Sequence, residues 1–154
     1  MREILFRAKH YRTKQWVYGI PFKNPLRGSE DAYYPQIIPE VHGVHSTIDS
    51  CSIVEETIGQ YTGLTDANGN KIFDGDVLRF GDKNYLVFWN GECFQWQMRT
   101  RKDRFLFPVY DGQDTGRPVE CITLGWVAAE IPIIGTMSTE IVGNIYDNPE
   151  LIEE

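Results

Sequence analysis

The stretch TIGQYTGLTDANGNKIFDGDVLRF, from Thr57 to Phe80, holds the densest run of turn-forming residues in the chain and limits the folds open to it. The residues of Asp66–Asn70 tolerate positive φ or bond their own backbone, and the Asn68-Gly69 pair predicts a type I′ turn. Asp74-Gly75-Asp76 predicts a second tight turn, and Val77–Phe80 then has the mixed branched and aromatic character of a strand. The three residues between the turns are too few for a helix. This arrangement is common at the start of small, strongly bent β-barrels.

The same residues also resemble a calcium-binding loop, because Asp66, Asn68 and Asn70 occupy its first, third and fifth positions. The sixth position needs glycine for a sharp turn but is Lys71. The twelfth needs a bidentate glutamate but is Val77. These departures favour a structural turn over a metal site.

Composition indicates short strands joined by turns. The 154 residues are enough for one domain or two small subdomains, and the chain contains 14 glycines and 8 prolines. Apolar residues make up 42 %, which is enough for a packed core, but no apolar run is long enough to cross a membrane. The charged N-terminal sequence lacks the apolar segment of a signal peptide. The cysteines Cys51, Cys93 and Cys121 are scattered, which predicts reduced thiols in a cytoplasmic protein.

Charge is distributed unevenly along the chain. The net charge of −7 argues against tight non-specific binding to nucleic acid. Residues 1–27 nevertheless carry seven Lys or Arg against Glu3 alone, whereas the tail from Asp147 carries four acidic residues and no basic ones. These two ends can attract each other within one molecule or between copies.

The N-terminal third predicts a hairpin and an irregular arm. Arg2–Ala8 and Gln15–Ile20 have strand patterns, with a polar turn between them. The next segment, Pro21–Pro39, contains four prolines, which remove ladder donors and predict irregular chain or a sheet edge, suited to a mobile binding arm. Thr47–Glu56 alternates loosely and predicts a strand that Glu55-Glu56 could end.

The clearest predicted hairpin joins Lys83–Trp89 to Glu92–Met98 through Asn90-Gly91. Phe94, Trp96 and Met98 are expected on one face of its second arm, with aromatic pairs across the hairpin. Towards the end of the chain, Ile141–Tyr146 predicts a closing strand. A single helical turn should follow it, with Asn148 as N-cap and Pro149 at the first helical position.

Two basic clusters form the candidate site for an anionic ligand. Their residues are Arg7, Lys9, Arg12 and Lys14 around the first hairpin, and Arg99, Arg101, Lys102 and Arg104 after the second. Solvated loops are the simpler interpretation of both clusters. The functional interpretation is a single phosphate-binding face, with Tyr11, Trp16 and Tyr18 available for stacking on a single strand.

No other sequence pattern predicts metal binding or catalysis. His42 and His45 form an H-x-x-H without acidic or cysteine partners at ligand spacing, so a metal site is not expected there. Asp74 and Asp76 flank a turn glycine, where aspartate usually binds backbone amides rather than acting as an acid–base pair. The common nucleophile, phosphate-loop, dinucleotide and zinc motifs are absent from the sequence. We therefore expect no enzymatic activity, no catalytic residue, no metal and no cofactor.

Three motifs resemble the signature of the YopX family, a group of small proteins from phages and prophages. They are the central run Gly59–Val77, the opening Met1–Ala8 and the close Glu140–Leu151. They occur in family order and bracket nearly the whole chain, whereas residues 34–52 and 98–130 carry no motif of the family. The resemblance implies an all-β body with an SH3-like barrel and a phage-related origin. The family has no established activity, so no catalytic residue is implied.

These expectations describe a single domain that is mainly β. An N-terminal β-hairpin region with the irregular arm spans residues 1–56, an SH3-like barrel spans 57–146, and an acidic tail spans 147–154. The first and last strands are expected to lie together and close the sheet. The expected function is that of a non-enzymatic interaction protein of phage or prophage origin in the cytoplasm of the bacterial host, binding a protein partner or itself as a homo-oligomer. A nucleic-acid-binding module that uses the two basic clusters is the alternative, and no membrane association is expected.

Overall fold

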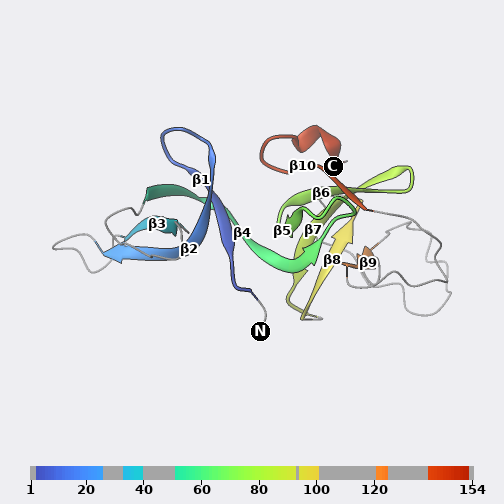
Figure 1. Cartoon of the computed structure of the whole chain (residues 1–154), viewed down its shortest axis with the longest axis horizontal. Helices are drawn as coiled ribbons and strands as arrows, with labels where there is room; N and C mark the ends of the chain where they lie inside the picture. The colour runs from blue at the N-terminus through green and yellow to red at the C-terminus, as the bar shows by residue number, and fades with distance from the viewer. Residues whose placement is uncertain are drawn as a thin grey trace. The chain divides into compact units, whose positions relative to one another are not determined.

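The computed structural model describes residues 3–25, 33–39, 51–92, 94–100, 121–124 and 139–152 (Figure 1). Within these ranges the regular structure consists of antiparallel β-strands and one short 3₁₀ turn, which confirms the mainly β class. The chain divides into two compact units, Met1–Tyr61 and Thr62–Glu154, which are described separately below.

The first unit is built from four strands that form a ring. These are β1 (Phe6–His10), β2 (Trp16–Pro25), β3 (Tyr33–Pro39) and β4 (Cys51–Thr65). Each strand pairs antiparallel with the next, and β1 also pairs with β4. The β1–β2 pair confirms the predicted first hairpin. β4 does not end at Glu55-Glu56 as predicted but continues through Thr65, because its bulge lets the pairing resume at Gly59.

The predicted irregular arm is wrong for the residues that the structure describes in Pro21–Pro39, since they extend β2 and form β3. Their register places every proline at alternate positions of one ladder: Gly19↔Pro39, Pro21↔Ile37, Lys23↔Pro35 and Pro25↔Tyr33. Alternate positions of an antiparallel pair are non-hydrogen-bonded, and a missing N–H there costs the ladder nothing. A proline spacing with period two is therefore compatible with a paired strand.

A small apolar core fills the ring. Ala8, Ile37 and Ile53 are buried, and the partly buried Val17 and Ile58 pack against them. Because side chains alternate between the two faces of a strand, the neighbours of these residues on β1 and β2 point outward. The inner face of the first hairpin therefore faces the core, and Arg7, Lys9, Trp16 and Tyr18 lie on its outer face.

A bulge in β4 allows the ring to close. Arg7 pairs with Gly59 but Lys9 pairs with Val54, so residues 55–58 lie opposite the single residue Ala8. The buried Thr57 hydroxyl fixes this bulge, because it donates to the Val54 carbonyl at 2.7 Å and accepts from the Lys9 N–H at 2.8 Å. Bulges bend a strand and increase its twist, as a ring of few strands requires.

The second unit carries a five-stranded antiparallel sheet. After the short strand β5 (Lys71–Phe73), which pairs with the end of β4, come β6 (Asp76–Phe80), β7 (Lys83–Asn90), β8 (Gln95–Arg99), β9 (Cys121–Thr123) and β10 (Glu140–Asn144). The order is β10-β6-β7-β8-β9, so that β6 to β9 form a meander and β10 returns beside β6. The predicted closure by the first and last strands is wrong, because β1 pairs with β2 and β4 while β10 pairs with β6.

Both faces of the second sheet are buried. Successive side chains of a strand point to opposite faces, so apolar residues at adjacent positions contribute to two different cores. One face holds a core made of Ile72, Leu78, Tyr85, Val87, Met98 and Leu124. The other face presents Val77 and Leu86, which are covered by Ile145, Leu151 and Ile152 from the end of the chain. Ile145, Leu151 and Ile152 therefore form a second layer on this face of the sheet.

Several turns differ in detail from their predictions. Gly69 has φ +83°, but Asn68 does not share the left-handed region, so the turn is not of type I′. The second hairpin is confirmed, but its loop spans residues 91–94, because Asn90 pairs with Gln95. The Asn90 carboxamide accepts from the Glu92 N–H at 2.9 Å and so initiates that longer loop. The C-terminal 3₁₀ turn (Pro149–Leu151) is confirmed, but the Asn148 side chain does not cap it.

Candidate functional site

The outer face of the β1–β2 hairpin brings cations and aromatic rings together. The register places Arg7 opposite Tyr18 and Lys9 opposite Trp16, so all four side chains share the face opposite the core residue Ala8. The Arg7 guanidinium lies 4.5 Å from the centre of the Trp16 ring, and the Lys9 ammonium lies 5.5 Å from it. Arg7 is only 7 % exposed, whereas Lys9 is half-buried, so Lys9 is the more accessible of the two cations.

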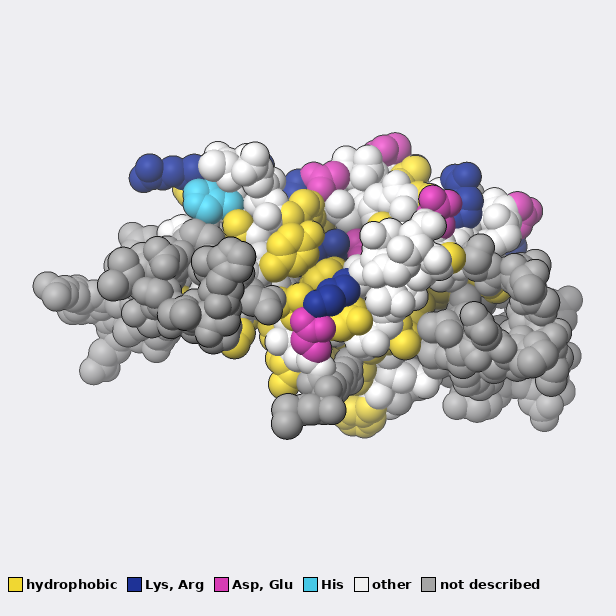
Figure 2. All heavy atoms as spheres, viewed as in Figure 1, with side chains coloured by type: hydrophobic (Ala, Val, Ile, Leu, Met, Phe, Trp, Pro, Cys, Tyr) yellow, Lys and Arg dark blue, Asp and Glu magenta, His cyan; other side chains and the backbone are white. Residues whose placement is uncertain are grey.

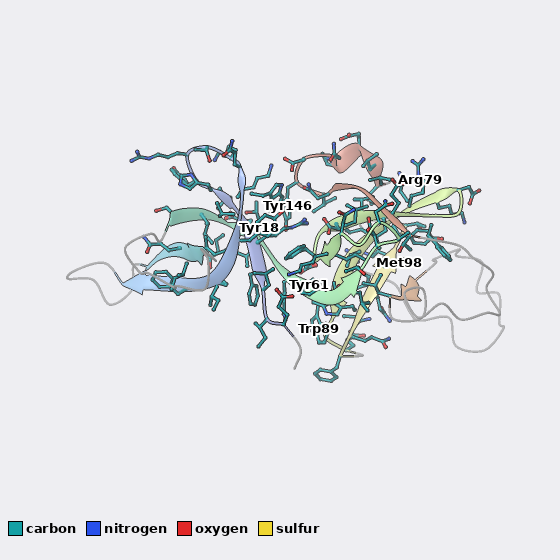
Figure 3. The ribbon with its side chains drawn as sticks, in the orientation of Figure 1. Tyr18, Tyr61, Arg79, Trp89, Met98 and Tyr146 are labelled. Carbon is teal, nitrogen blue, oxygen red and sulfur yellow. The ribbon has the colours of Figure 1, made fainter. Side chains whose placement is uncertain are left out.

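The same face continues along β2 as an apolar row. Tyr18 and Ile20 follow Trp16 at alternate positions and remain 45 % and 46 % exposed. We call the set Arg7, Lys9, Trp16, Tyr18 and Ile20 the hairpin face. Figure 3 labels Tyr18 on β2. A solvated strand normally carries polar residues on its outward face, so the partial exposure of Tyr18 and Ile20 is unusual.

The tip of this hairpin is ordered by a histidine. His10 Nδ1 accepts hydrogen bonds from the backbone N–H groups of Arg12 and Thr13, both at 3.2 Å. Lys14 adopts a left-handed φ of 59° and donates its N–H to the His10 carbonyl at 3.0 Å. The turn therefore has one defined shape although it is solvent exposed.

The hairpin tip, defined as Tyr11, Arg12 and Lys14, presents basic side chains to solvent. Tyr11 is 62 % exposed, and the Lys14 ammonium lies 5.1 Å from the centre of its ring. In Figure 2 basic side chains project beside the histidine at the upper left. The structure thus brings the four predicted basic residues of the first cluster onto one hairpin, with two on its face and two at its tip.

The second predicted basic cluster is only partly described. Arg99 ends β8 in the second unit, and its guanidinium lies 4.5 Å from the centre of the Phe88 ring. Arg101, Lys102 and Arg104 lie outside the described residues, as do His42 and His45. The expectation of one anionic-ligand face built from both clusters stays a prediction.

A second exposed surface, which the sequence did not indicate, lies at the end of the β7–β8 hairpin. Trp89 is 44 % exposed and Phe94 is 79 % exposed, and Figure 3 labels Trp89 near this end. Trp89 and Trp96 face each other across the hairpin with ring centres 5.2 Å apart at 68°, which confirms the predicted aromatic pairing. The sequence placed Phe94 within a strand, but it lies in the loop with a left-handed φ of 52°.

The aspartates of the central turns bind backbone rather than presenting free carboxylates. Asp66 is buried; its Oδ1 accepts from the Asn68 and Asn70 N–H groups at 2.9 and 2.8 Å, and its Oδ2 accepts from Asn70 Nδ2 and from the Ile141 N–H. Asp76 is 1 % exposed, and its Oδ2 accepts from the Phe73 N–H at 2.7 Å. The predicted structural turns at both positions are confirmed.

The ionisation of Asp66 reflects these bonds. Burial by itself raises the pKa of its carboxyl group, but the hydrogen bonds from Asn70, Ile141 and Asn68 outweigh burial and lower the pKa below 3.8. The group is therefore an anion at neutral pH with its oxygens occupied by donors. This is a structural role, because the donors belong to the chain itself.

The C-terminal motif is packed against the second turn. Gly75 has φ +82°, and its carbonyl accepts from the Ile145 N–H at 2.8 Å. A Cβ at Gly75 would lie 3.1 Å from the Tyr146 ring, and a Cβ at Gly143 would lie 2.5 Å from Asn148 Oδ1. Two of the three sequence motifs thus meet in one structural clasp, in which glycine is needed for close approach.

The described ranges contain no group of three or more His, Cys, Asp or Glu side chains placed to hold a metal ion. No helix in those ranges has the length and apolar character needed to cross a bilayer.

A comparison with known protein families identifies the family to which these motifs belong. A family model described as YopX protein matches residues 5–153. The chain belongs to the YopX family. The match covers all but the ends of the chain and confirms the resemblance found in its three motifs. A crystal structure of protein EF1440 from Enterococcus faecalis is similar to this YopX-family chain, with a TM-score of 0.48 and 22 % identity over 99 % of this chain and 100 % of that one. No curated protein matches the chain.

Sequence reasoning missed the residues that shape the hairpin surface. Nothing in the sequence marks His10 as an acceptor for the turn, because its role depends on the exact register at the end of β1. The stacking of Arg7 and Lys9 on Trp16 could be inferred once the pairing of Lys9 with Trp16 is known. The alternation of charged residues on β1 with aromatic residues on β2 was the available signal.

Proposed function

We propose that this YopX-family chain is a non-enzymatic interaction protein of phage or prophage origin that binds a protein partner through the hairpin face. The observation that carries the proposal is the side-by-side exposure of Tyr18 and Ile20 next to an Arg7–Trp16 stack. Aromatic residues and arginine are enriched at the energetic centres of protein interfaces. The proposed place of action is the cytoplasm of the bacterial host.

The setting of the face supports this function. β1 and β2 belong to a closed ring with its own core, and Arg7 is already held against Trp16 before any partner arrives. Ordering costs are a large part of the free energy of association, so a preformed face binds with less loss. The acidic net charge of −7 also favours protein contacts over non-specific contacts with nucleic acid.

We further propose that the second unit is the SH3-like body implied by the family. Its sheet order supports that assignment, because β6 to β9 form a four-strand meander and the last strand, β10, returns beside β6. The Asp66 loop supports it as well, because Ala67 donates its N–H to the Thr139 carbonyl at 2.9 Å and so links the β4–β5 hairpin to the segment that enters β10.

Partner retention tests the hairpin face. Immobilised wild-type protein and the double variant Tyr18→Glu/Ile20→Glu are incubated with lysate from host cells after prophage induction, and bound proteins are quantified by mass spectrometry. A matched control, Ala67→Glu/Asn68→Glu, adds the same two charges at exposed turn positions of the second unit. We expect at least one protein to be retained by wild type and control and lost by the face variant. A set of retained proteins that is the same for all three, with circular dichroism showing each folded, overturns the proposal.

A second candidate function is single-stranded nucleic-acid binding through the hairpin tip. It is favoured by the exposure of Tyr11, Arg12 and Lys14 on a turn of fixed shape, because stacking rings and cations together suit a flexible polyanion. Fluorescence anisotropy with a labelled oligonucleotide at low salt tests it, with Arg12→Glu/Lys14→Glu as the variant and Lys71→Glu/Lys83→Glu as the charge-matched control. Binding that weakens with salt and is lost only in the tip variant supports this function. Absence of binding by the wild type at low salt excludes it.

A further inference from the structure

The exposed large hydrophobic side chains of the described residues gather mainly at two places. Tyr11, Tyr18 and Ile20 lie on the β1–β2 hairpin, and Trp89 and Phe94 lie at the end of the β7–β8 hairpin. We call Trp89, Glu92 and Phe94 the β7–β8 tip. In Figure 2 hydrophobic side chains are exposed at the lower edge of the view. Each copy of the chain therefore carries one exposed apolar surface in each unit.

The two surfaces have opposite charge. The hairpin carries Arg7, Lys9, Arg12 and Lys14, and the described segment 3–25 holds Glu3 as its acidic residue. Residues 89–94, at the end of the β7–β8 hairpin, contain Glu92 and no basic residue, whereas the basic residues Lys83 and Arg99 lie at the opposite end of the hairpin. The second unit contains 15 acidic against 8 basic residues. A contact between the hairpin of one copy and the tip of another would pair unlike charges around apolar centres.

The β7–β8 tip has a defined conformation. Trp96 packs against the main core of the second unit, and Trp89 packs on Trp96. The Asn90 side chain fixes the start of the loop through the Glu92 N–H, which leaves Phe94 projecting from a defined turn.

The geometry points to head-to-tail self-association, in which the β7–β8 tip of one copy docks on the hairpin face of a second copy. This inference rests on the proposed function and names the partner as another copy of the chain. Contact between two hairpin faces would bring the basic residues of two β1–β2 hairpins together, and contact between two β7–β8 tips would place Glu92 against Glu92, so both contacts are disfavoured by repulsion. A heterologous contact avoids both repulsions and leaves one surface of each kind unfilled, so that assembly continues to larger oligomers.

Complementation between two variants tests this arrangement. The face variant Tyr18→Glu/Ile20→Glu keeps a functional tip, and the tip variant Trp89→Thr/Phe94→Asn keeps a functional face; asparagine tolerates the left-handed backbone at position 94. Sedimentation velocity measures the mass of wild type, each variant and the equimolar mixture over a range of concentrations. We expect the mass of wild type to rise with concentration, each variant alone to remain at 17.8 kDa, and the mixture to form a 1:1 complex of twice that mass. Only one functional contact can form in the mixture, so its growth stops at two chains.

Other outcomes overturn the inference. Wild type that remains monomeric at all concentrations excludes self-association, and a face variant that still self-associates while the mixture forms no heterodimer indicates contact between like surfaces. If Trp89→Thr/Phe94→Asn fails to fold, the single variant Phe94→Asn replaces it, because that side chain is 79 % exposed. A monomeric wild type whose lysate partner is lost on Tyr18→Glu/Ile20→Glu would overturn self-association alone. If the wild type self-associates but no lysate protein is lost with the variant Tyr18→Glu/Ile20→Glu, the partner of the proposed function is a second copy of the chain.

Discussion

Asp66 Oδ2 accepts a hydrogen bond from the backbone N–H of Ile141 at 3.2 Å, although the two residues lie 75 positions apart in the sequence. The bond joins the loop of the β4–β5 hairpin to β10. The neighbouring bond from Ala67 to Thr139 reinforces this junction. A carboxylate in a turn near the middle of the chain therefore fixes the position of the last strand.

Replacing Asp66 should lower the stability of the second unit. The Asp66→Ala variant leaves the N–H groups of Asn68, Asn70 and Ile141 without their acceptor, so we expect the free energy of unfolding to fall by about 2–4 kcal/mol. Asp66→Asn retains the Oδ1 acceptor but places an amide donor opposite the Ile141 N–H, and should cost about 1–2 kcal/mol. Urea denaturation followed by circular dichroism measures both. Equal stability of wild type and Asp66→Ala would contradict the role assigned to this carboxylate.

Acidification should remove the contribution of the same group. The pKa of Asp66 in the fold lies below its ordinary value of 3.8, so the folded chain holds this proton less readily than the unfolded chain. The stabilisation is therefore fully present above about pH 5 and is lost as the pH falls through the folded pKa. The difference in unfolding free energy between wild type and Asp66→Asn, measured in urea from neutral to acidic pH, should narrow on acidification. A difference that widens would reverse the assigned sign.

A methyl group at Gly143 should displace the C-terminal layer. Its Cβ would lie 2.5 Å from Asn148 Oδ1 and 2.8 Å from Leu151 Cδ1, so Gly143→Ala should cost about 1–3 kcal/mol. Gly91→Ala is the matched control, because nothing lies within 4 Å of its Cβ, and it should change stability by less than about 0.5 kcal/mol. Thermal unfolding compares the two. Adding Asn148→Gly removes one of the clashing groups and should recover part of the loss.

The hairpin tip should depend on the acceptor at His10. His10→Ala removes the acceptor for the Arg12 and Thr13 N–H groups, and should lower stability by about 0.5–1.5 kcal/mol and speed hydrogen exchange at those two amides. His10→Asn retains an acceptor at a similar distance from the backbone and should restore slow exchange. Exchange measured by NMR distinguishes them. Equally fast exchange in both variants would show that the turn does not need this bond.

Local turn chemistry in the sequence predicted much of the β framework. Asp74-Gly75-Asp76 identified a tight turn, and the run from Lys83 to Met98 identified a hairpin, because both are set by residues close in sequence. The loop of that hairpin was predicted too short, since the Asn90 side chain starts a longer loop instead of occupying a two-residue turn. Short-range signals identify the existence of a turn better than its geometry.

The pairing of strands that are distant in the sequence could not be predicted from local sequence patterns. Proline content argued against strands in Pro21–Pro39, yet the spacing of the prolines keeps them at alternate positions of the β2–β3 ladder. The contact of β1 with β4 depends on the Thr57 bulge, which has no local signature. Periodicity of prolines, rather than their number, was the informative feature.

The sequence predicted which basic residues the candidate site contains but not which side chains they contact. The binding of an anionic ligand by Arg7 and Lys9 stays a prediction, and their contact with Trp16 on the outer face of the hairpin was not predicted. That contact arises from strand register, which fixes the cross-strand neighbours of each side chain. The exposure of Phe94 was missed because the loop was assigned to the strand.

The division between the two units falls after Tyr61, inside the uninterrupted strand β4. One ribbon of backbone therefore supplies hydrogen-bonding partners to both halves of the protein. A fragment that begins or ends at this point would contain only part of β4. A fragment boundary in the turn at residues 66–70 would keep that strand whole.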